Sequence, residues 1–174
     1  MRRLLLFRHA KATVATGHDD HERALMERGR RDAARVAAFI AASGLTPELV
    51  VHSGARRARE TAEIARAAWP HLIEARVEPR LYEASRPTVE AIVRALPDGS
   101  ASVMVVGHNP SLADVANHLV GHGADLDLLR ISAKFPTASL AALEFDVAHW
   151  RDVQPGSAKL ACFATPDDPK LEKV

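Results

Sequence analysis

The stretch Leu4-Leu5-Leu6-Phe7-Arg8-His9-Ala10-Lys11 decides the fold, because an unbroken apolar run ends abruptly in charged and polar residues. A short continuous run of this kind, rather than an alternating one, is typical of a strand buried on both faces of a sheet. Leu49-Val50-Val51 and Val103-Met104-Val105-Val106 repeat the pattern further along the chain. We therefore predict three buried strands in one parallel sheet that is covered by helices.

The segments between these strands have helical periodicity. Apolar residues recur at helical spacing over residues 26–43 and 55–69, and we expect these helices to end at Gly44 and Pro70. A shorter helix is expected over residues 87–96, because a proline follows it directly.

A fourth helix is expected after the third strand. Asn109 and Pro110 are typical of an N-cap and a first helical turn, so we predict a helix that runs to about Val120, with Gly121 at its C-cap.

The last third of the chain has a different pattern. Residues 139–145 and 159–163 are typical of strands with no helix between them, which predicts an antiparallel pair, and a further strand is expected around residues 75–77. The order of elements predicts an α/β fold, a three-layer helix–sheet–helix sandwich with a mostly parallel central sheet and an antiparallel C-terminal part. We expect one domain over residues 1–165 and a flexible tail over residues 166–174.

Composition limits the possible functions. The chain has 174 residues, of which 47% are apolar, and 23 basic against 22 acidic residues leave a net charge of +1. This balance argues against a nucleic-acid or membrane-surface binder, which needs a basic face. Cys162 is the only cysteine, which favours a reducing compartment. The run Leu4–Phe7 is too short for a membrane span or a signal peptide, so we expect a cytoplasmic protein.

Histidines and arginines follow the three predicted strands. Arg8 and His9 follow the first strand, Arg57 lies shortly after the second, and His108 and Asn109 follow the third. In folds of this class ligands lie beyond the carboxyl ends of the strands. Cations beside helix N-termini bind anions, and guanidinium groups match phosphoryl oxygens in pairs. A single histidine after a strand is more often a surface residue. The prediction of a phosphate site therefore depends on histidine or arginine following all three strands.

Several blocks of the sequence resemble the histidine phosphatase superfamily, the phosphoglycerate mutase-like proteins. Leu6-Phe7-Arg8-His9-Ala10 resembles the Arg-His-Gly block that follows the first strand, and its Ala10 followed by Lys11 is similar to the SixA-type phosphohistidine phosphatase branch. Residues 53–62 are similar to the second block, Ser-Pro-x-x-Arg-Ala-x-Gln-Thr-Ala, which places the pocket arginine at Arg57.

Two further blocks appear in the same order as in the family. Val106-Gly107-His108-Asn109-Pro110 is similar to the block that holds the second histidine, and residues 23–29 resemble Arg-Pro-Leu-Thr-x-x-Gly. The departures are Gly54 for proline, Glu60 for glutamine, and Ala24 and Met26 for proline and threonine. They fall at turns and helix starts and leave the expected phosphate ligands unchanged.

The resemblance implies phosphoryl transfer without a metal or a cofactor. His9 would attack phosphorus and hold a covalent phosphoryl group, which water then releases. Arg8 and Arg57 would lower the pKa of His9 and stabilise charge on the phosphoryl oxygens. His108 would donate to a phosphoryl oxygen, and the helix that starts at Asn109 would add backbone N–H groups.

The remaining candidates have weaker signals. Glu83 resembles the position of an acidic proton donor, although a surface carboxylate has the same pattern. Lys11 and Arg23 are candidates for phosphate or substrate contacts, with a solvated surface role as the alternative. An ester leaving group needs a proton, whereas the imidazole of phosphohistidine can arrive already protonated.

The expected partner is a phosphorylated protein, such as a histidine-phosphotransfer domain, because so short a chain leaves little room for a roof over the site. A small phosphate ester and non-catalytic binding of phosphoproteins are the alternatives. Metal-dependent hydrolysis would use His18-Asp19-Asp20-His21 or the pair His118 and His122. Cys162 lacks the arginine of a cysteine-based phosphatase loop, and residues 125–129 lack the threonine that ends an aspartate-nucleophile motif.

Overall fold

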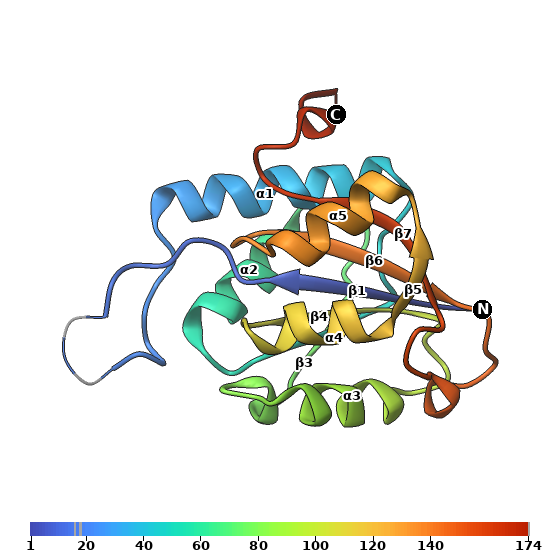
Figure 1. Ribbon diagram of the computed structural model, residues 1–174. Coiled ribbons are helices and arrows are strands. Elements are labelled where there is room, and N and C mark those ends of the chain that lie inside the picture. Colours follow the sequence, from blue (N-terminus) through green and yellow to red (C-terminus); the bar gives the residue numbers. More distant parts are fainter. Residues whose placement is uncertain (16, 18, 174) are drawn as a thin grey trace.

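A computed structural model describes residues 1–15, 17 and 19–173, the last by its backbone alone. In this part of the chain one seven-stranded sheet lies between two layers of helices (Figure 1). The strand order is β3-β2-β4-β1-β6-β7-β5. The strands are β1 (Arg2–Arg8), β2 (Leu49–His52), β3 (Glu74–Val77), β4 (Ser102–Gly107), β5 (Val120–Gly123), β6 (Leu140–Phe145) and β7 (Ala158–Ala164).

The predicted helices are present, and one further helix follows β5. The α-helices are α1 (Glu27–Ala42), α2 (Arg56–Ala67), α3 (Arg86–Arg94), α4 (Ser111–Leu119) and α5 (Asp125–Ala133). Short 3-10 helices lie at Pro79–Leu81, Trp150–Asp152 and Pro169–Lys173. The end of α1 is as predicted, because Gly44 takes a φ of +66° and the N–H of Leu45 donates to the Ile40 carbonyl.

The direction of the strands confirms the predicted fold class. β1 pairs in parallel with β4, β4 with β2, β2 with β3, and β5 with β7. β6 is antiparallel to both of its neighbours, β1 and β7. The sheet is therefore mostly parallel, and the antiparallel part lies in the C-terminal third.

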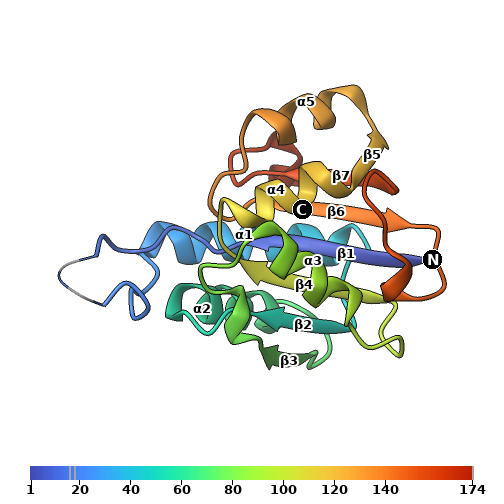
Figure 2. The ribbon, with the colours of Figure 1, turned by 60° about the horizontal axis from the view of Figure 1, so that its bottom comes forward.

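The continuous apolar runs fill both faces of the sheet. Leu5 and Phe7 pack with α1 and α2, whereas Leu4 and Leu6 pack with α3 and α4. In Figure 2, α3 and α4 lie in front of the strands and α1 lies behind them. All four side chains are fully buried. Successive residues of a strand face opposite sides of a sheet, so a strand between two helical layers needs apolar residues at every position.

Both predicted caps of the fourth helix are wrong, each by one residue. Pro110, not Asn109, occupies the N-cap position of α4, and Val120 is its C-cap. Gly121 lies in β5, where a Cβ atom would stand 1.9 Å from the carbonyl oxygen of Gly156. The sequence did not predict β5, because glycine at this position serves close approach of two backbones rather than strand propensity.

The segment predicted as a flexible tail makes specific contacts in its described part. Asp168 is buried and accepts a hydrogen bond from Arg130 at 2.8 Å, and Leu171 packs in the core between α1 and the sheet. Flexibility of residues 166–174 stays a prediction, but these contacts join the segment to the domain. None of the helices described is long and apolar enough to cross a membrane.

Candidate active site

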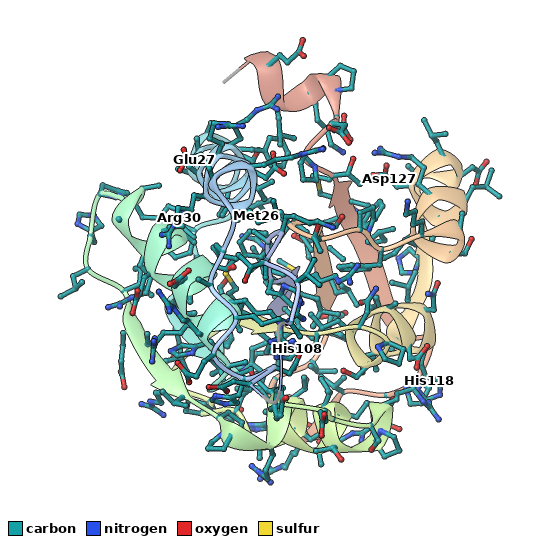
Figure 3. All side chains as sticks on the ribbon, turned by 90° about the vertical axis from the view of Figure 1, so that its left-hand side faces the viewer. Met26, Glu27, Arg30, His108, His118 and Asp127 are labelled. Carbon is teal, nitrogen blue, oxygen red and sulfur yellow. The ribbon has the colours of Figure 1, made fainter. Side chains whose placement is uncertain are left out.

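The parallel strands bring the predicted residues together at their carboxyl edge. Arg8 ends β1, His9 and His108 directly follow β1 and β4, and Arg57 lies in the first turn of α2. Figure 3 shows this edge from the side to which β1 points in Figure 1, with His108 near the middle of the view. A cavity of about 270 Å³ opens here. Seven of the eight predicted site residues line it, all but Glu83, together with Ala12 and Thr137.

A backbone hydrogen bond orients the ring of His9, which lines this cavity. Its side chain is buried, with 8% of the residue exposed, and its Nδ1 atom lies 2.9 Å from the Ala10 carbonyl oxygen. A carbonyl oxygen can only accept, so Nδ1 must donate its proton. In the neutral ring the Nε2 atom then keeps its lone pair, which is the form that attacks phosphorus.

Burial keeps His9 neutral. It lowers the pKa of His9 to about 3, with smaller contributions from the charges of His108, Arg57 and Arg8, while the hydrogen bond to Ala10 acts in the opposite direction. The direction agrees with the sequence prediction, but loss of hydration contributes more than the neighbouring arginines. The site therefore offers an unprotonated imidazole at neutral pH.

His108 presents an N–H group beside His9. The two ring centroids are 5.0 Å apart, and Nε2 of His108 lies 2.8 Å from the Ser53 hydroxyl oxygen. That oxygen already accepts from the N–H of Ala55, so we assign the hydroxyl proton to the bond with Nε2. Nδ1 of His108 then holds the ring proton, is buried, and has no hydrogen-bond partner among the described residues. Burial, with Arg57 second, lowers the pKa of His108 to about 4.

The two arginines are fixed by acceptors from different loops. Arg8 donates from Nη1 to the Phe135 carbonyl at 2.9 Å, and Arg57 donates to the carbonyl and the carboxylate of Asp20. The Nε atom of each arginine is buried without a partner in the described part of the chain. Unpaired buried N–H groups beside a cavity are costly unless a ligand or water accepts from them, and an anion rich in oxygen would do so.

Thr61 joins the first turn of α2 to the end of β1. Its hydroxyl oxygen accepts from the N–H of Ala10 at 3.1 Å and donates to the Arg57 carbonyl at 2.6 Å. The bond fixes the backbone that carries the arginine relative to the backbone that follows His9. The threonine of the second motif therefore has a structural role in the site.

The contacts of Glu60 explain why this chain can have glutamate where the family motif has glutamine. Its carboxylate accepts from the N–H of Leu25 at 2.9 Å, from Arg30 at 3.0 Å and from Arg56 at 2.8 Å. A glutamine could make only part of this set, and the two arginines compensate the added charge of the glutamate. The bond to Leu25 holds the base of the loop that follows β1.

The three residues predicted to bind substrate line the cavity, and they differ in how many contacts hold their side chains. Lys11 is exposed, and its backbone is packed against Gly29, where a Cβ atom would lie 2.1 Å from the Lys11 carbonyl oxygen. Arg23 donates to Asp20 at 2.9 Å and to the Thr13 carbonyl at 2.8 Å. Asn109 donates to the Phe135 carbonyl at 2.9 Å, the same oxygen that holds Arg8, so its side chain builds the cavity wall instead of capping α4.

Glu83 lies outside the cavity. It is exposed, with a φ of +52°, and within the described structure it makes no side-chain hydrogen bond or ion pair. Its role as a general acid stays a prediction. The neighbouring Tyr82, which the sequence did not single out, is the residue that reaches the site, because its ring meets that of His108 edge to face at 5.8 Å.

The residues proposed for a metal site have other partners. His118 pairs with Glu90 at 2.6 Å, and Asp20 accepts from arginines. His18 lies outside the described residues, and those that are described include no group of three acidic, histidine or cysteine side chains placed to hold an ion. The sequence predicts Asp20 only as a metal ligand, and its position three residues before Arg23, with which it pairs, is the signal that relates it to the site.

Comparisons with known proteins agree with this geometry. Residues 4–87 match the model of the histidine phosphatase superfamily (branch 1). An uncharacterized protein of Mycobacterium tuberculosis is 37% identical over 161 residues, which cover 91% of this chain and 99% of that protein.

Two solved structures have the same fold along their whole length. A protein of Agrobacterium tumefaciens assigned as the phosphohistidine phosphatase SixA is 30% identical, with a TM-score of 0.80 over 95% of this chain and 98% of that one. A protein of Nakamurella multipartita with the same assignment is 28% identical, with a TM-score of 0.79 over 96% and 97% of the two chains. The motifs, the fold and the arrangement of the two histidines and two arginines show that this chain belongs to the histidine phosphatase superfamily.

Proposed function

We propose that this protein is a metal-independent phosphatase that removes phosphoryl groups from phosphohistidine in proteins through a covalent intermediate on His9. The observation that carries the proposal is the neutral His9 ring. Its Nδ1–H is bonded to the Ala10 carbonyl, and its remaining nitrogen belongs to a cavity that Arg8, Arg57 and His108 also line.

The reaction proceeds in two displacements. The Nε2 lone pair of His9 forms a bond to phosphorus while the bond from phosphorus to the substrate imidazole breaks, and that imidazole leaves with the electron pair. Water then attacks the phosphorus on His9, the electron pair of the P–N bond returns to Nε2, and inorganic phosphate departs with the protons of the water. Arg8, Arg57 and the Nδ1–H of His108 supply donors for the negative charge on the phosphoryl oxygens.

The residues that line the cavity favour a phosphoramidate over an ester. The lining contains four cationic side chains and two histidines, but no carboxylate among the described residues. An alkoxide leaving group requires a proton donor, whereas an imidazole protonated on its second nitrogen leaves without one. A site that lacks a carboxylic acid therefore suits phosphohistidine.

The surroundings of the cavity favour a substrate that extends beyond the phosphoryl group. A second cavity of about 260 Å³ adjoins the first and shares Lys11 and Thr137 with it. Lys134 also lines it, and neither lysine has an acidic partner within the described structure. A protein surface around a phosphorylated histidine would cover both cavities, and a histidine-phosphotransfer domain is the partner that we propose.

The test measures phosphate release from a phosphohistidine-containing transfer domain and from an aryl phosphate, both in the presence of a chelator. The wild type is expected to act on both substrates, with the higher kcat/KM on the protein. His9→Ala is expected to lower the rate by at least about a thousandfold, as loss of a nucleophile does. The exposed His71→Ala is the matched control and should keep the wild-type rate.

Each proposal has its own contrary result. Absence of turnover by the wild type would contradict the phosphatase and favour a binding protein, whereas an undiminished rate for His9→Ala would contradict the covalent mechanism on His9. A kcat/KM that is higher for the aryl phosphate than for the protein would contradict the substrate class alone. Loss of activity in chelator that zinc or magnesium restores would contradict metal independence.

A further inference from the structure

Each terminal nitrogen of Arg57 already donates one of its two N–H groups before any substrate binds. Nη1 donates to the Asp20 carbonyl at 2.7 Å, and Nη2 donates to Oδ2 of the same residue at 3.1 Å. The arginine is 5% exposed, so its position leaves little freedom. This contact uses the end of the guanidinium group that bidentate binding of an anion would otherwise use.

Asp20 is itself held by two further donors. The Tyr82 hydroxyl donates to Oδ2 at 2.8 Å, and Nε of Arg23 donates to Oδ1 at 2.9 Å. These bonds, with Tyr82 the largest cause, hold the pKa of Asp20 below its usual value, so the carboxylate stays charged. Asp20 lies in the loop after β1, and its side chain is 45% exposed. The side chains of Arg57, Tyr82 and Arg23 nevertheless fix its orientation.

Tyr82 connects this carboxylate to the catalytic histidine pair. Its ring packs edge to face against His108 at 5.8 Å and against His21 at 5.0 Å, and the guanidinium carbon of Arg57 lies 5.9 Å from its centroid. The His21 carbonyl in turn accepts from the N–H of Arg56, at the first residue of α2. The loop after β1 is therefore fastened to the helix that carries Arg57.

We propose that Asp20, supported by Tyr82, is a positioning residue that clamps the terminal nitrogens of Arg57 and so directs the Nε side of its guanidinium group toward the phosphoryl group. The buried Nε–H of Arg57, which has no partner among the described residues, and the second N–H of each terminal nitrogen are the donors that this arrangement leaves for substrate. Without the clamp the four rotatable bonds of the arginine would allow it to meet an anion end-on, out of line with His9. The inference rests on the proposed function.

The experiment compares Asp20→Ala, Asp20→Asn and Tyr82→Phe with wild type in two assays. One assay measures kcat and KM for the phosphohistidine protein, and the other measures the Kd for orthovanadate by titration calorimetry, which requires no turnover. Asp20→Ala is expected to lower kcat/KM about a hundredfold, since small misplacements of positioned groups have effects of this size. It should also weaken orthovanadate binding at least tenfold.

The other variants separate position from charge. Asp20→Asn keeps an oxygen that can accept from Arg57 and is expected to recover most of the loss, while Tyr82→Phe should lose about three- to tenfold in kcat/KM. Asp19→Asn is the matched control, because Asp19 is exposed, carries the same charge next in sequence, and bonds only to the N–H of Glu22 among the described contacts. It should be within twofold of wild type.

Three results would overturn the clamp. Asp20→Ala that binds orthovanadate more tightly would show that the carboxylate competes with the substrate for Arg57. Asp20→Ala within twofold of wild type in both assays would show that Arg57 needs no support. Asp20→Asn as impaired as Asp20→Ala would assign the effect to negative charge.

A wild type that binds orthovanadate in an Asp20-dependent way but hydrolyses neither substrate would support the clamp and contradict the proposed function.

Discussion

Among the described residues, the histidine and arginine side chains at the carboxyl edge of the sheet and those between α3 and α4 differ in how their charge is balanced. At the carboxyl edge of the parallel strands, Arg8, His9 and His108 have no acidic hydrogen-bond partner among the described residues. Between α3 and α4, by contrast, the buried carboxylate of Glu90 accepts from His118 and from two arginines of its own helix. Figure 3 shows His108 near the centre of the carboxyl edge and His118 at the periphery.

The difference separates a cluster that is complete by itself from one that a ligand could complete. Glu90 compensates its neighbours, so the α3–α4 cluster needs no ligand and serves packing. At the carboxyl edge the compensation is incomplete, and buried N–H groups of Arg8, Arg57 and His108 lack partners in the described structure. Burying donors without acceptors is unfavourable, and such sites persist where a ligand completes them.

The largest effect should come from removing an arginine of the carboxyl edge whose buried Nε–H lacks a partner in the described structure. Arg57→Ala is expected to lower kcat/KM on the phosphohistidine protein by about a thousandfold, as loss of a donor to a developing oxyanion does. Arg59→Ala is the matched control, because Arg59 lies on the same helix with its side chain about half exposed and pairs only weakly with Glu63. Equal losses in the two variants would remove the distinction between the clusters.

The buried histidines of the site, His9 and His108, should also make the free energy of unfolding depend on pH. Their folded pKa values of about 3 and about 4 lie below the ordinary value of about 6.5, so between these limits the unfolded chain binds protons that the folded chain does not. The free energy of unfolding should therefore fall, by up to several kcal/mol, as the pH drops from about 6.5 to 4. Urea unfolding at a series of pH values measures this.

The assignment to His9 and His108 can be checked by substitution. The double variant His9→Gln and His108→Gln should flatten the pH dependence between 6.5 and 4, whereas His71→Gln should leave it unchanged. In NMR titrations the ring protons of His9 and His108 should keep their neutral shifts between pH 8 and 5. Titration of either ring near pH 6.5 would contradict the effect of burial.

The α3–α4 cluster should respond in stability and not in activity. Glu90→Gln replaces a buried charge that accepts from three side chains, and we expect a loss of about 1–3 kcal/mol in the free energy of unfolding. The kcat/KM, measured below the unfolding transition, should remain within twofold of wild type. A tenfold loss of activity with an unchanged fold would show that this cluster also serves the reaction.

The smallest expected effect is that of replacing Glu83, the predicted proton donor, which lies outside the cavity. Glu83→Gln is expected to slow the cleavage of a phosphate ester about tenfold at most and to leave the phosphohistidine protein within twofold, because only the ester needs a proton in flight. Glu78→Gln, which alters an ion pair between the partly buried Glu78 and the exposed Arg80, controls for the loss of a nearby charge. Equal rate losses on the two substrates would contradict this difference.

Much of the site could be predicted from local sequence. A continuous apolar run specifies a strand buried on both faces, and parallel strands end at one edge, so Arg8, His9 and His108 had to lie near one another. Arg57 followed from the second motif. Tyr82 and the contacts of Asp20 could not be predicted, because they depend on a loop folding back onto α2 and on a side chain directly after the 3-10 helix at Pro79–Leu81.

The sequence by itself determined most of the elements, though not β5 and α5, together with the order of the motifs and the candidate site residues, since propensity, periodicity and residue chemistry are local properties. Only the tertiary structure decided how those groups behave. It buried His9 and thereby lowered its pKa, drew Asn109 to the Phe135 carbonyl, left Glu83 at the surface, and placed Gly121 where β5 meets Gly156. Each of these depends on atoms that are distant in the chain, because hydration, hydrogen-bond partners and close backbone contacts exist only once the chain has packed.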